Sequence, residues 1–251
     1  TVATFHSLFE QLTDSAGIFV KHCPIMIVSG NTTMIHFLLG LDAWTVFASP
    51  YAPVSSDPGF FWGSELGMAF DGLVYMIPSA SNYVGGDIVS GLLQLQLHKQ
   101  EKTCLFFDIG TNGEMVLGSK DRRIACSTAA GPAFEGAKIS CGMRGAEGAV
   151  DHVWLEKDEI KYHIIGETAP KGLCGSGLLD LVAVLLDTGI LDGSGYLEEK
   201  EFTLCENVTL TQKDIREVQL AKAAIRAGIE LLAENLGVEI ENIRKVCLAG
   251  A

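Results

Sequence analysis

An apolar strand that runs into an acidic residue and a tight glycine turn limits the fold of this chain more than any other feature. Residues 105–109 have the apolar character of a buried strand, and residues 114–117 alternate between polar and apolar side chains as a returning strand does. Between them, Asn112 and Gly113 form one of the strongest short hairpin signals. A further strand is expected at 122–127, so this region predicts a three-stranded antiparallel meander.

The tip of this hairpin carries groups that bind phosphate in proteins. It can present successive N–H groups and one hydroxyl to an anion. The residues concerned are Gly110, Thr111, Asn112 and Gly113. Asp108, at the end of the strand, can hold a hydrated divalent cation. Because acid, glycines and hydroxyl coincide at one strand end, the sequence predicts a phosphate-binding turn, with an ordinary hairpin as the alternative interpretation.

Composition narrows the classes of ligand. The 251 residues are 48% hydrophobic, which is enough for a substantial core. The formal charge of -13 has no basic cluster to offset it, which argues against binding to nucleic acid or to a membrane surface. Seven scattered cysteines without a C-x-x-C pair predict reduced thiols rather than disulfides or a metal site. No apolar segment is long enough to span a membrane and no signal peptide is visible, so we expect a cytoplasmic protein.

The pattern of helices and strands predicts an α/β fold in two parts, residues 1–99 and 100–251. In the first part, the stretch 49–67 is rich in proline, glycine and serine, and we interpret it as a structured loop or lid. The other elements expected there are an amphipathic helix with Phe5, Leu8, Phe9 and Leu12 on one face, a strand at 24–28, a helix at 32–39 closed by Gly40, a strand at 73–77, and a helix from Ser81 or Asn82 to about residue 98.

Glycine-rich segments in the second part bring the backbone close to a ligand, to another segment or to another chain. One spans 128–148 and includes Gly131, with a short helix expected at 134–140. Another, 172–177, opens directly into an apolar helix, so N–H groups at a helix start face whatever fills the loop. The other elements expected are a hairpin of 149–155 and 159–165, a helix at 178–186, a long amphipathic helix between a Thr211 and Asp214 capping box and Gly237, and a strand at 245–248.

Three glycine-bearing turns together indicate a nucleotide cleft. They lie at 108–113, at 172–177 and at 249–250. The first would bind phosphates, the second offers a helix start, and the third can take an adenine or ribose face. The common alternatives do not match, because the chain has no P-loop motif, the glycine order in 172–177 differs from a dinucleotide fingerprint, and Ser176 lacks the flanking glycines of a hydrolase elbow.

Five separated segments carry the most distinctive motifs of the chain. They are 29–34, 108–114, 129–137, 142–144 and 172–177. Together they resemble the C-terminal part of the reductive activators of corrinoid proteins, which belong to the superfamily of acetate and sugar kinases, heat-shock chaperones and actin (ASKHA). The resemblance implies an actin-like, ribonuclease-H-like ATPase fold. Residues 1–99 would then be the remainder of the first lobe with a connecting loop and helix, and residues 100–251 the second lobe with the phosphate-binding hairpin.

The resemblance also implies a function that uses ATP and magnesium. Hydrolysis would drive the reduction of cobalt(II) to cobalt(I) in a corrinoid protein or corrinoid-dependent methyltransferase. Asp108 would hold the metal, and Glu114 would orient the attacking water unless it is simply an outward-facing strand residue. The implied cofactor-binding positions are Gly110, Thr111, Asn112, Gly113, Gly131, Gly175, Ser176 and Gly177, with Gly250 on the adenosine side.

The sequence also departs from the pattern of this family. The family carries an N-terminal iron–sulfur domain of ferredoxin type and, in the first lobe, another Asp-x-Gly-Thr hairpin, and neither motif occurs here. We therefore expect a fragment with weak or absent ATPase activity of its own, an electron donor in the missing ferredoxin-type domain, and a capacity to form a homodimer. Two other functions fit the motifs, namely a small-molecule kinase of the same superfamily and a non-catalytic module that docks on a corrinoid protein.

Overall fold

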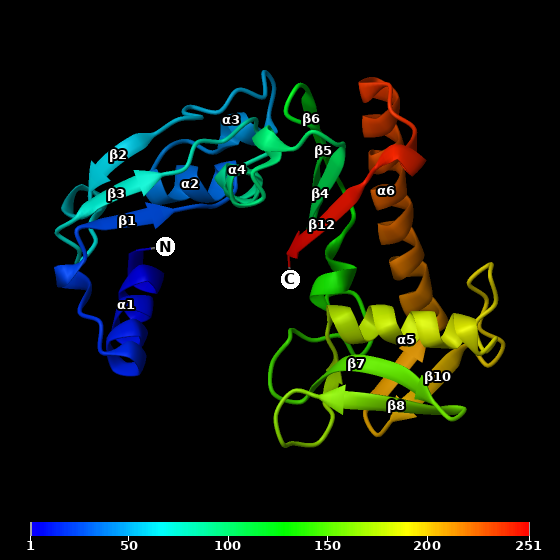
Figure 1. Ribbon diagram of the computed structural model, residues 1–251. Coiled ribbons are helices and arrows are strands. Elements are labelled where there is room, and N and C mark those ends of the chain that lie inside the picture. The colour runs from blue at the N-terminus through cyan, green and yellow to red at the C-terminus, as the bar shows by residue number, and fades with distance from the viewer. Residues whose placement is uncertain (1, 251) are drawn as a thin grey trace. The chain divides into compact units, whose positions relative to one another are not determined.

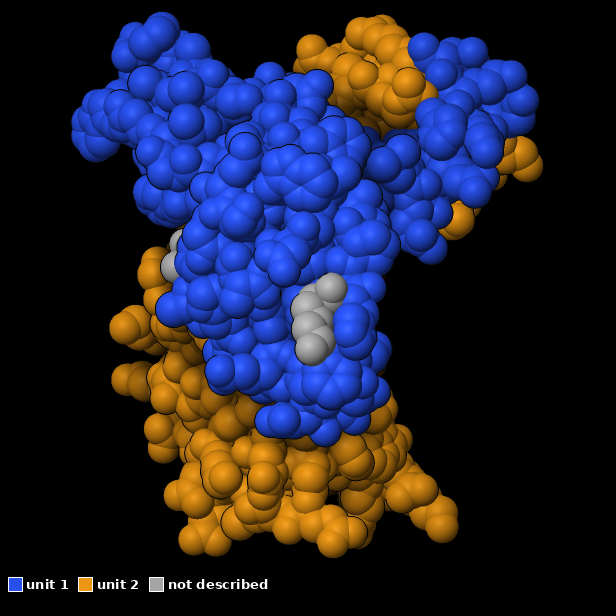
Figure 2. Space-filling model, turned by 90° about the vertical axis from the view of Figure 1, so that its left-hand side faces the viewer, with its two compact units in different colours: residues 1–101, 119–121 blue, residues 102–118, 122–251 orange. Residues whose placement is uncertain are grey.

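The computed structural model describes residues 2–250, and the chain divides into two compact units, which Figure 2 shows in different colours. Unit 1 comprises residues 1–101 and 119–121, and unit 2 comprises residues 102–118 and 122–251. Each unit has a hydrophobic core of its own. Within the described residues, every helix is too short or too polar to cross a bilayer.

Unit 1 is built on a three-stranded mixed sheet with the strand order β1-β3-β2 (Figure 1). β1 (Ile25–Val28) and β3 (Leu73–Met76) are parallel, and β2 (Gly59–Trp62) pairs antiparallel with β3. β1 leads into α2 (Thr32–Leu39), and β3 leads toward α4 (Gly86–Gln94). The remaining helical segments are α1 (Val2–Ala16), α3 (Trp44–Phe47) and the 3-10 turns η1 (Val20–His22), η2 (Gly63–Leu66) and η3 (Leu97–Lys99).

One face of the unit 1 sheet forms the core of this unit. Val28, Val74 and Met76 are buried there, together with Ile35 and Leu38 of α2. Side chains alternate between the two faces along each strand, so the residues between these buried positions point to the opposite face. The predicted strand at 24–28 and the helix at 32–39 are confirmed.

The interpretation of 49–67 as a loop or lid is wrong in its central part. Residues Gly59–Trp62 form β2, which pairs with β3 along its whole length. Phe61 packs against the core while its neighbours on the strand point away from it. The aromatic triplet therefore belongs to a sheet, and the prolines and glycines around it only set the ends of the strand.

The helix predicted from Ser81 or Asn82 begins later, at Gly86. The backbone of Ser81 bridges that of Val84, so these residues close a turn instead of starting a helix. A β-carbon on Gly86 would lie 2.5 Å from the carbonyl oxygen of Ile77, so only glycine fits where the helix passes the residue that follows β3.

Unit 2 contains a four-stranded sheet with the order β12-β4-β5-β6. The strands are β4 (Cys104–Ile109), β5 (Gly113–Gly118), β6 (Arg123–Thr128) and β12 (Lys245–Gly250). β4, β5 and β6 form the predicted antiparallel meander, and β12 joins the other side of β4 in parallel. The predicted hairpin is therefore confirmed, and its tip lies at the same edge of the sheet as the end of β12.

The long helix α6 (Gln212–Leu236) covers one face of this sheet. Phe107, Met115 and Leu117 are buried against Leu232 of the helix. The predicted capping box is present, because the Thr211 side chain and the Asp214 side chain each bond to the other's backbone N–H. The helix ends at Gly237, which has a φ of 72°.

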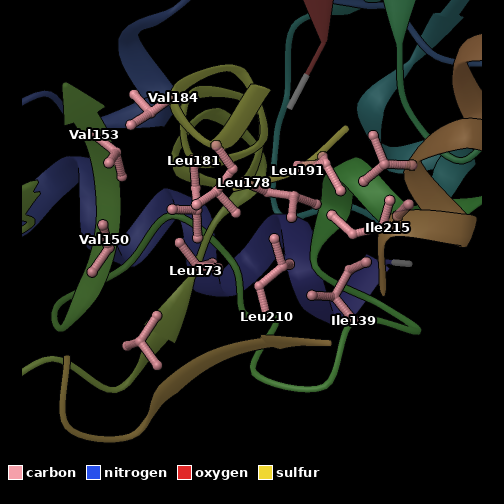
Figure 3. Packing of buried hydrophobic residues seen from close by; sticks show 14 of the residues in the cluster. Ile139, Val150, Val153, Leu173, Leu178, Leu181, Val184, Leu191, Leu210 and Ile215 are labelled. Carbon is pink, nitrogen blue, oxygen red and sulfur yellow. The ribbon is translucent and has the colours of Figure 1, made fainter. Parts of the chain in front are cut away.

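A second group of elements packs on the other end of α6. A sheet of order β8-β7-β9 lies against α5, and the buried side chains of these elements and of the hairpin β10–β11 meet in one cluster (Figure 3). The elements are η4 (Pro132–Glu135), β7 (Ala149–Glu156), β8 (Glu159–Ile164), β9 (Gly172–Leu173), α5 (Gly175–Asp187), β10 (Glu201–Cys205) and β11 (Val208–Thr211). The 3-10 turn η5 (Ile240–Asn242) follows α6 and packs instead with the core of the four-stranded sheet. β10 and β11 are not among the predicted strands.

Two boundaries in this group differ from the prediction. The short helix expected at 134–140 is a single 3-10 turn at 132–135, because Gly136 follows it with a φ of 81°. α5 begins at Gly175 rather than at Leu178, so Gly175 and Gly177 lie in the first turn of the helix.

Candidate functional site

The hairpin tip is a tight turn with one exposed side. Gly113 pairs with Ile109, and the N–H of Gly110 donates to the carbonyl oxygen of Asn112 at 2.9 Å, which closes the turn. That N–H is therefore used within the hairpin. Thr111 and Asn112 are exposed, so their polar groups are the ones that can meet a ligand.

Gly110 and Gly113 are glycines for different reasons. A β-carbon on Gly113 would lie 2.9 Å from the hydroxyl of Thr128 and 3.0 Å from the ring of Phe107, so packing excludes a side chain there. A β-carbon on Gly110 would meet nothing closer than 3.8 Å, and its φ is not positive. The protein itself leaves the space above Gly110 open.

Two carboxylates face the same side of the hairpin. Asp108 on β4 stands directly opposite Glu114 on β5, and both are half-buried. Glu114 accepts a hydrogen bond of 3.1 Å from the hydroxyl of Ser127, its partner on β6. This bond gives Glu114 a structural contact in addition to the catalytic role implied for it.

A magnesium ion at this position would depend on few protein ligands. Within residues 2–250, no three His, Cys, Asp or Glu side chains gather closely enough to hold a metal alone. Magnesium commonly keeps several waters and takes one or two carboxylates together with phosphate oxygens. Asp108, beside a turn suited to phosphates, fits that type of site.

A polar contact joins the hairpin tip to η4. The hydroxyl of Thr111 donates to the carboxylate of Glu135, the last residue of that turn. Gly131 precedes η4 with a φ of 78°, a conformation that favours glycine and turns the chain after β6. Gly131 therefore shapes the backbone that leads to Glu135.

Glu135 also lines a cavity of about 600 Å³ inside unit 2. The wall consists of the start of α5, η4, the segment after it and part of β7. Its residues are Phe134, Glu135, Met143, Arg144, Gly145, Asp151, Ile165, Cys174, Gly175 and Ser176. Arg144 is the one basic side chain in that wall, so it and the N–H groups of the first helical turn are the groups that attract an anion.

The glycines at the start of α5 allow close packing. A β-carbon on Gly175 would lie 2.0 Å from the carbonyl oxygen of Phe134, and one on Gly177 would lie 2.1 Å from that of Val150. Ser176 donates its hydroxyl to the carbonyl oxygen of Asp151 at 2.8 Å. Gly175 and Ser176 line the cavity, whereas Gly177 is buried against β7 and serves packing.

The backbone segment that leads to Arg144 is tied to other elements of unit 2 by hydrogen bonds. The N–H of Met143 donates to the carbonyl oxygen of Leu173 at 2.8 Å, which ties this segment to β9. One turn earlier, Ser140 donates both its N–H, at 2.8 Å, and its hydroxyl, at 3.1 Å, to the carboxylate of Asp214. Asp214 is fully buried, so the start of α6 fixes the segment that carries Arg144.

Gly250 lies next to the hairpin, at the end of β12. It is the register partner of Ile109, and a β-carbon there would lie 2.1 Å from the carbonyl oxygen of Ile109. The structure therefore brings Asp108, the turn at 110–113 and Gly250 to one edge of the four-stranded sheet. Gly175 and Ser176 belong to the neighbouring cavity, and the contact between Thr111 and Glu135 connects the two groups.

Three residues of this site have no role in the sequence-based account. Glu135 and Arg144 fall inside motifs that the sequence singles out, but no role follows from their spacing. Asp151 lies in a strand with no motif. Only the tertiary contacts bring these charged side chains to one cavity.

The family models match both parts of the chain. Residues 102–251 match the model described as the C-terminal domain of RACo, the ASKHA domain, and residues 1–100 match the RACo middle region. The chain belongs to the RACo family. The predicted ASKHA fold and the predicted resemblance to reductive activators of corrinoid proteins are therefore confirmed.

Relatives of this RACo family member have names that refer to corrinoid activation. The chain is 34% identical over 278 residues to the "Corrinoid activation enzyme RamQ" of Eubacterium limosum, a match that covers 99% of this chain and 46% of RamQ. It is 28% identical over 196 residues to a "[Co(II) methylated amine-specific corrinoid protein] reductase" of Methanosarcina barkeri, covering 69% of this chain and 36% of that protein.

A solved structure of a "Reductive activator for corrinoid,iron-sulfur protein" superposes with a TM-score of 0.89. It is 37% identical in sequence, and the match covers 99% of this chain and 44% of that chain. The present chain thus spans less than half the length of each of these relatives.

Proposed function

We propose that this chain is the ATP-binding part of an activator that couples ATP hydrolysis to the reduction of cobalt(II) to cobalt(I) in a corrinoid protein. Family membership supports the reductive role, since the relatives are named as corrinoid activation enzymes and reductases. The ATP-binding part of the proposal rests on the turn at Gly110, which has open space above it and is flanked by Asp108. Thr111 connects this turn to a cavity whose wall contains one arginine.

In this proposal each part of the site has a separate task. The exposed turn at Thr111 and Asn112 holds the terminal phosphates by backbone N–H groups, and the Thr111 hydroxyl joins them when it turns away from Glu135. Asp108 would hold the magnesium ion, and Glu114 would orient the water that attacks the terminal phosphate. Magnesium supplies positive charge that offsets the charge of the phosphates. Arg144 attracts the nucleotide to the neighbouring cavity.

The reduction itself needs parts outside this chain. A reduced iron–sulfur cluster in a ferredoxin-type domain would supply one electron to the cobalt(II) ion, while ATP and water become ADP and phosphate. Hydrolysis can drive this transfer if the nucleotide state changes how the activator grips its corrinoid partner or methyltransferase. The seven cysteines have free thiols, which supports a reducing, cytoplasmic location.

Titration calorimetry of the 251-residue chain with Mg-ATP tests the nucleotide site. We expect measurable binding with weak turnover, and Asp108→Asn should lower the affinity at least tenfold, about 1.4 kcal/mol. Asp158→Asn is the matched control, because Asp158 is exposed in the turn between β7 and β8 and loses the same charge. Equal affinities of the two variants, or no binding when the rest of the protein is also present, would refute the proposal.

A further inference from the structure

A single hydrogen bond links the hairpin tip to the wall of the neighbouring cavity. Thr111 lies at the exposed tip, and its hydroxyl donates to Oε2 of Glu135. Glu135 is half-buried and lines the cavity. The two residues are 24 positions apart in the sequence, so the bond joins separate segments of unit 2. We call it the Thr111–Glu135 contact.

The backbone of η4 fixes the position of Glu135. The next residue, Gly136, donates its N–H to the carbonyl oxygen of Ala133 at 3.0 Å, which closes the 3-10 turn. A β-carbon on Gly136 would lie 2.5 Å from the carbonyl oxygen of Met143, so the chain after Glu135 is packed tightly against another segment. Glu135 can therefore change its partner by rotating its side chain, without a change in the fold.

The Glu135 carboxylate competes with a phosphate for the Thr111 hydroxyl. A hydroxyl has one proton to donate, so Thr111 cannot donate to the carboxylate and to a phosphate at the same time. Both acceptors carry negative charge. Repulsion between such charges at hydrogen-bond distances lowers affinity about fivefold even in water-like surroundings. A terminal phosphate at this turn therefore has to displace Glu135.

We propose that Glu135 sets the preference of this site between ATP and ADP. The inference rests on the proposed function, in which the last phosphate of ATP reaches Thr111. ATP breaks the Thr111–Glu135 contact, whereas ADP is one phosphate shorter and leaves the contact intact. Part of the binding energy of ATP is then used to release Glu135, so the two nucleotides favour different states of the cavity wall.

Arg144 provides a cation for the released carboxylate. It is the one basic side chain in the cavity wall that Glu135 also lines. Within residues 2–250, its guanidinium group takes part in no hydrogen bond or ion pair. Pairing with Arg144 offsets the charge of Glu135 after the phosphate has taken its place at Thr111. The exchange of partners gives the contact two distinct states.

Titration calorimetry with two nucleotides tests this inference. The probes are Mg-ADP and magnesium with a non-hydrolysable ATP analogue, each titrated into the 251-residue chain. Glu135→Gln keeps the size of the side chain and an acceptor for the Thr111 hydroxyl, but it removes the charge. We expect this variant to bind the ATP analogue about tenfold more tightly than the wild type, with an Mg-ADP affinity within about twofold of the wild type.

Salt separates repulsion from a change in packing. Raising the ionic strength from about 0.05 M to about 0.5 M screens exposed charges, so the gain of Glu135→Gln should shrink. Glu135→Ala, which also removes the acceptor, should bind the ATP analogue more tightly as well, and circular dichroism would show that both variants are folded. Glu206→Gln is the matched control, because Glu206 is exposed between β10 and β11, outside the cavity wall, and loses the same charge.

The outcomes separate this inference from the proposed function. If both Glu135 variants keep the wild-type ratio of the two affinities, the inference is overturned. Weaker binding of the ATP analogue by Glu135→Gln overturns it too, because Glu135 would then help to bind the nucleotide or its magnesium. In either case, a loss of affinity in Asp108→Asn leaves the proposed function standing. A wild-type chain that binds neither nucleotide, even with the rest of the protein present, refutes both.

Discussion

Removing the carboxylate of Asp214 should destabilise unit 2 strongly. This side chain is fully buried and accepts four hydrogen bonds from only two residues. One oxygen accepts from the N–H and hydroxyl of Ser140, and the other accepts from the N–H and hydroxyl of Thr211. Asp214 thereby joins the start of α6 to the segment that leads to Arg144.

The magnitude follows from the groups left without an acceptor. In Asp214→Ala, the N–H groups of Ser140 and Thr211 each lose a hydrogen bond to a carboxylate, at about 1.5–3 kcal/mol each. Loss of the capping box adds about 1 kcal/mol. Relief from burying a charge offsets part of this loss, so we expect a net destabilisation of about 4 kcal/mol. For a domain of this size, that corresponds to a fall in Tm of about 10 °C.

Urea unfolding followed by circular dichroism measures this effect. Asp187→Ala provides the control, because Asp187 is exposed at the end of α5 and its loss should change stability by less than about 0.5 kcal/mol. Because the same network positions Arg144, we also expect folded Asp214 variants to bind nucleotide more weakly. A loss of stability below about 1 kcal/mol in Asp214→Ala would contradict this reasoning, because the four hydrogen bonds would then contribute little to the free energy of unfolding.

Two further predictions concern the hairpin and a buried thiol. Gly113→Ala should cost about 1–3 kcal/mol of stability, because its β-carbon would crowd Thr128 and Phe107. Gly110→Ala should keep stability within about 0.5 kcal/mol but weaken Mg-ATP binding about tenfold in calorimetry, and unchanged affinity would contradict a ligand above this residue. Burial raises the pKa of the Cys141 thiol above 9.0, so the folded protein holds this proton more tightly than the unfolded chain and loses stability as the pH rises past that value. Cys141→Ala should reduce the fall in Tm between about pH 8 and pH 10, whereas an unaltered fall would exclude this thiol as a cause.

Local signals in the sequence predict most of the regular elements. The turn at Asn112 and Gly113, the helix end at Gly40 and the capping box of Thr211 and Asp214 each depend on a few neighbouring residues, and the structure contains all three. Such signals operate within one or two turns of chain, so the fold around them changes them little.

Elements that depend on distant partners are harder to predict. Phe61 alternates with exposed aromatic residues, but only the pairing of β2 with β3 turns this stretch into a strand. The hairpin of β10 and β11 likewise lacks a clear turn signal of its own. Gly86 lies close to the carbonyl group of Ile77, which follows β3, so only the folded structure shows why a glycine stands at the start of this helix.

The candidate functional site is also only partly predictable from the sequence. The sequence predicts the hairpin tip because all of its groups are adjacent in the chain. It does not predict the contact between Thr111 and Glu135, or the cavity with Arg144, because these groups come from separate segments. The sequence also does not distinguish the roles of the two glycines. Packing requires glycine at position 113, whereas Gly110 has open space around it.

A structure of the intact protein with magnesium and a non-hydrolysable ATP analogue tests the central claim most directly. The account predicts that oxygens of the terminal phosphate lie within hydrogen-bond distance, about 3 Å, of the backbone N–H groups of Thr111 and Asn112, with a magnesium-bound water on Asp108. Phosphates bound elsewhere, with this turn in contact with protein or solvent alone, would contradict it.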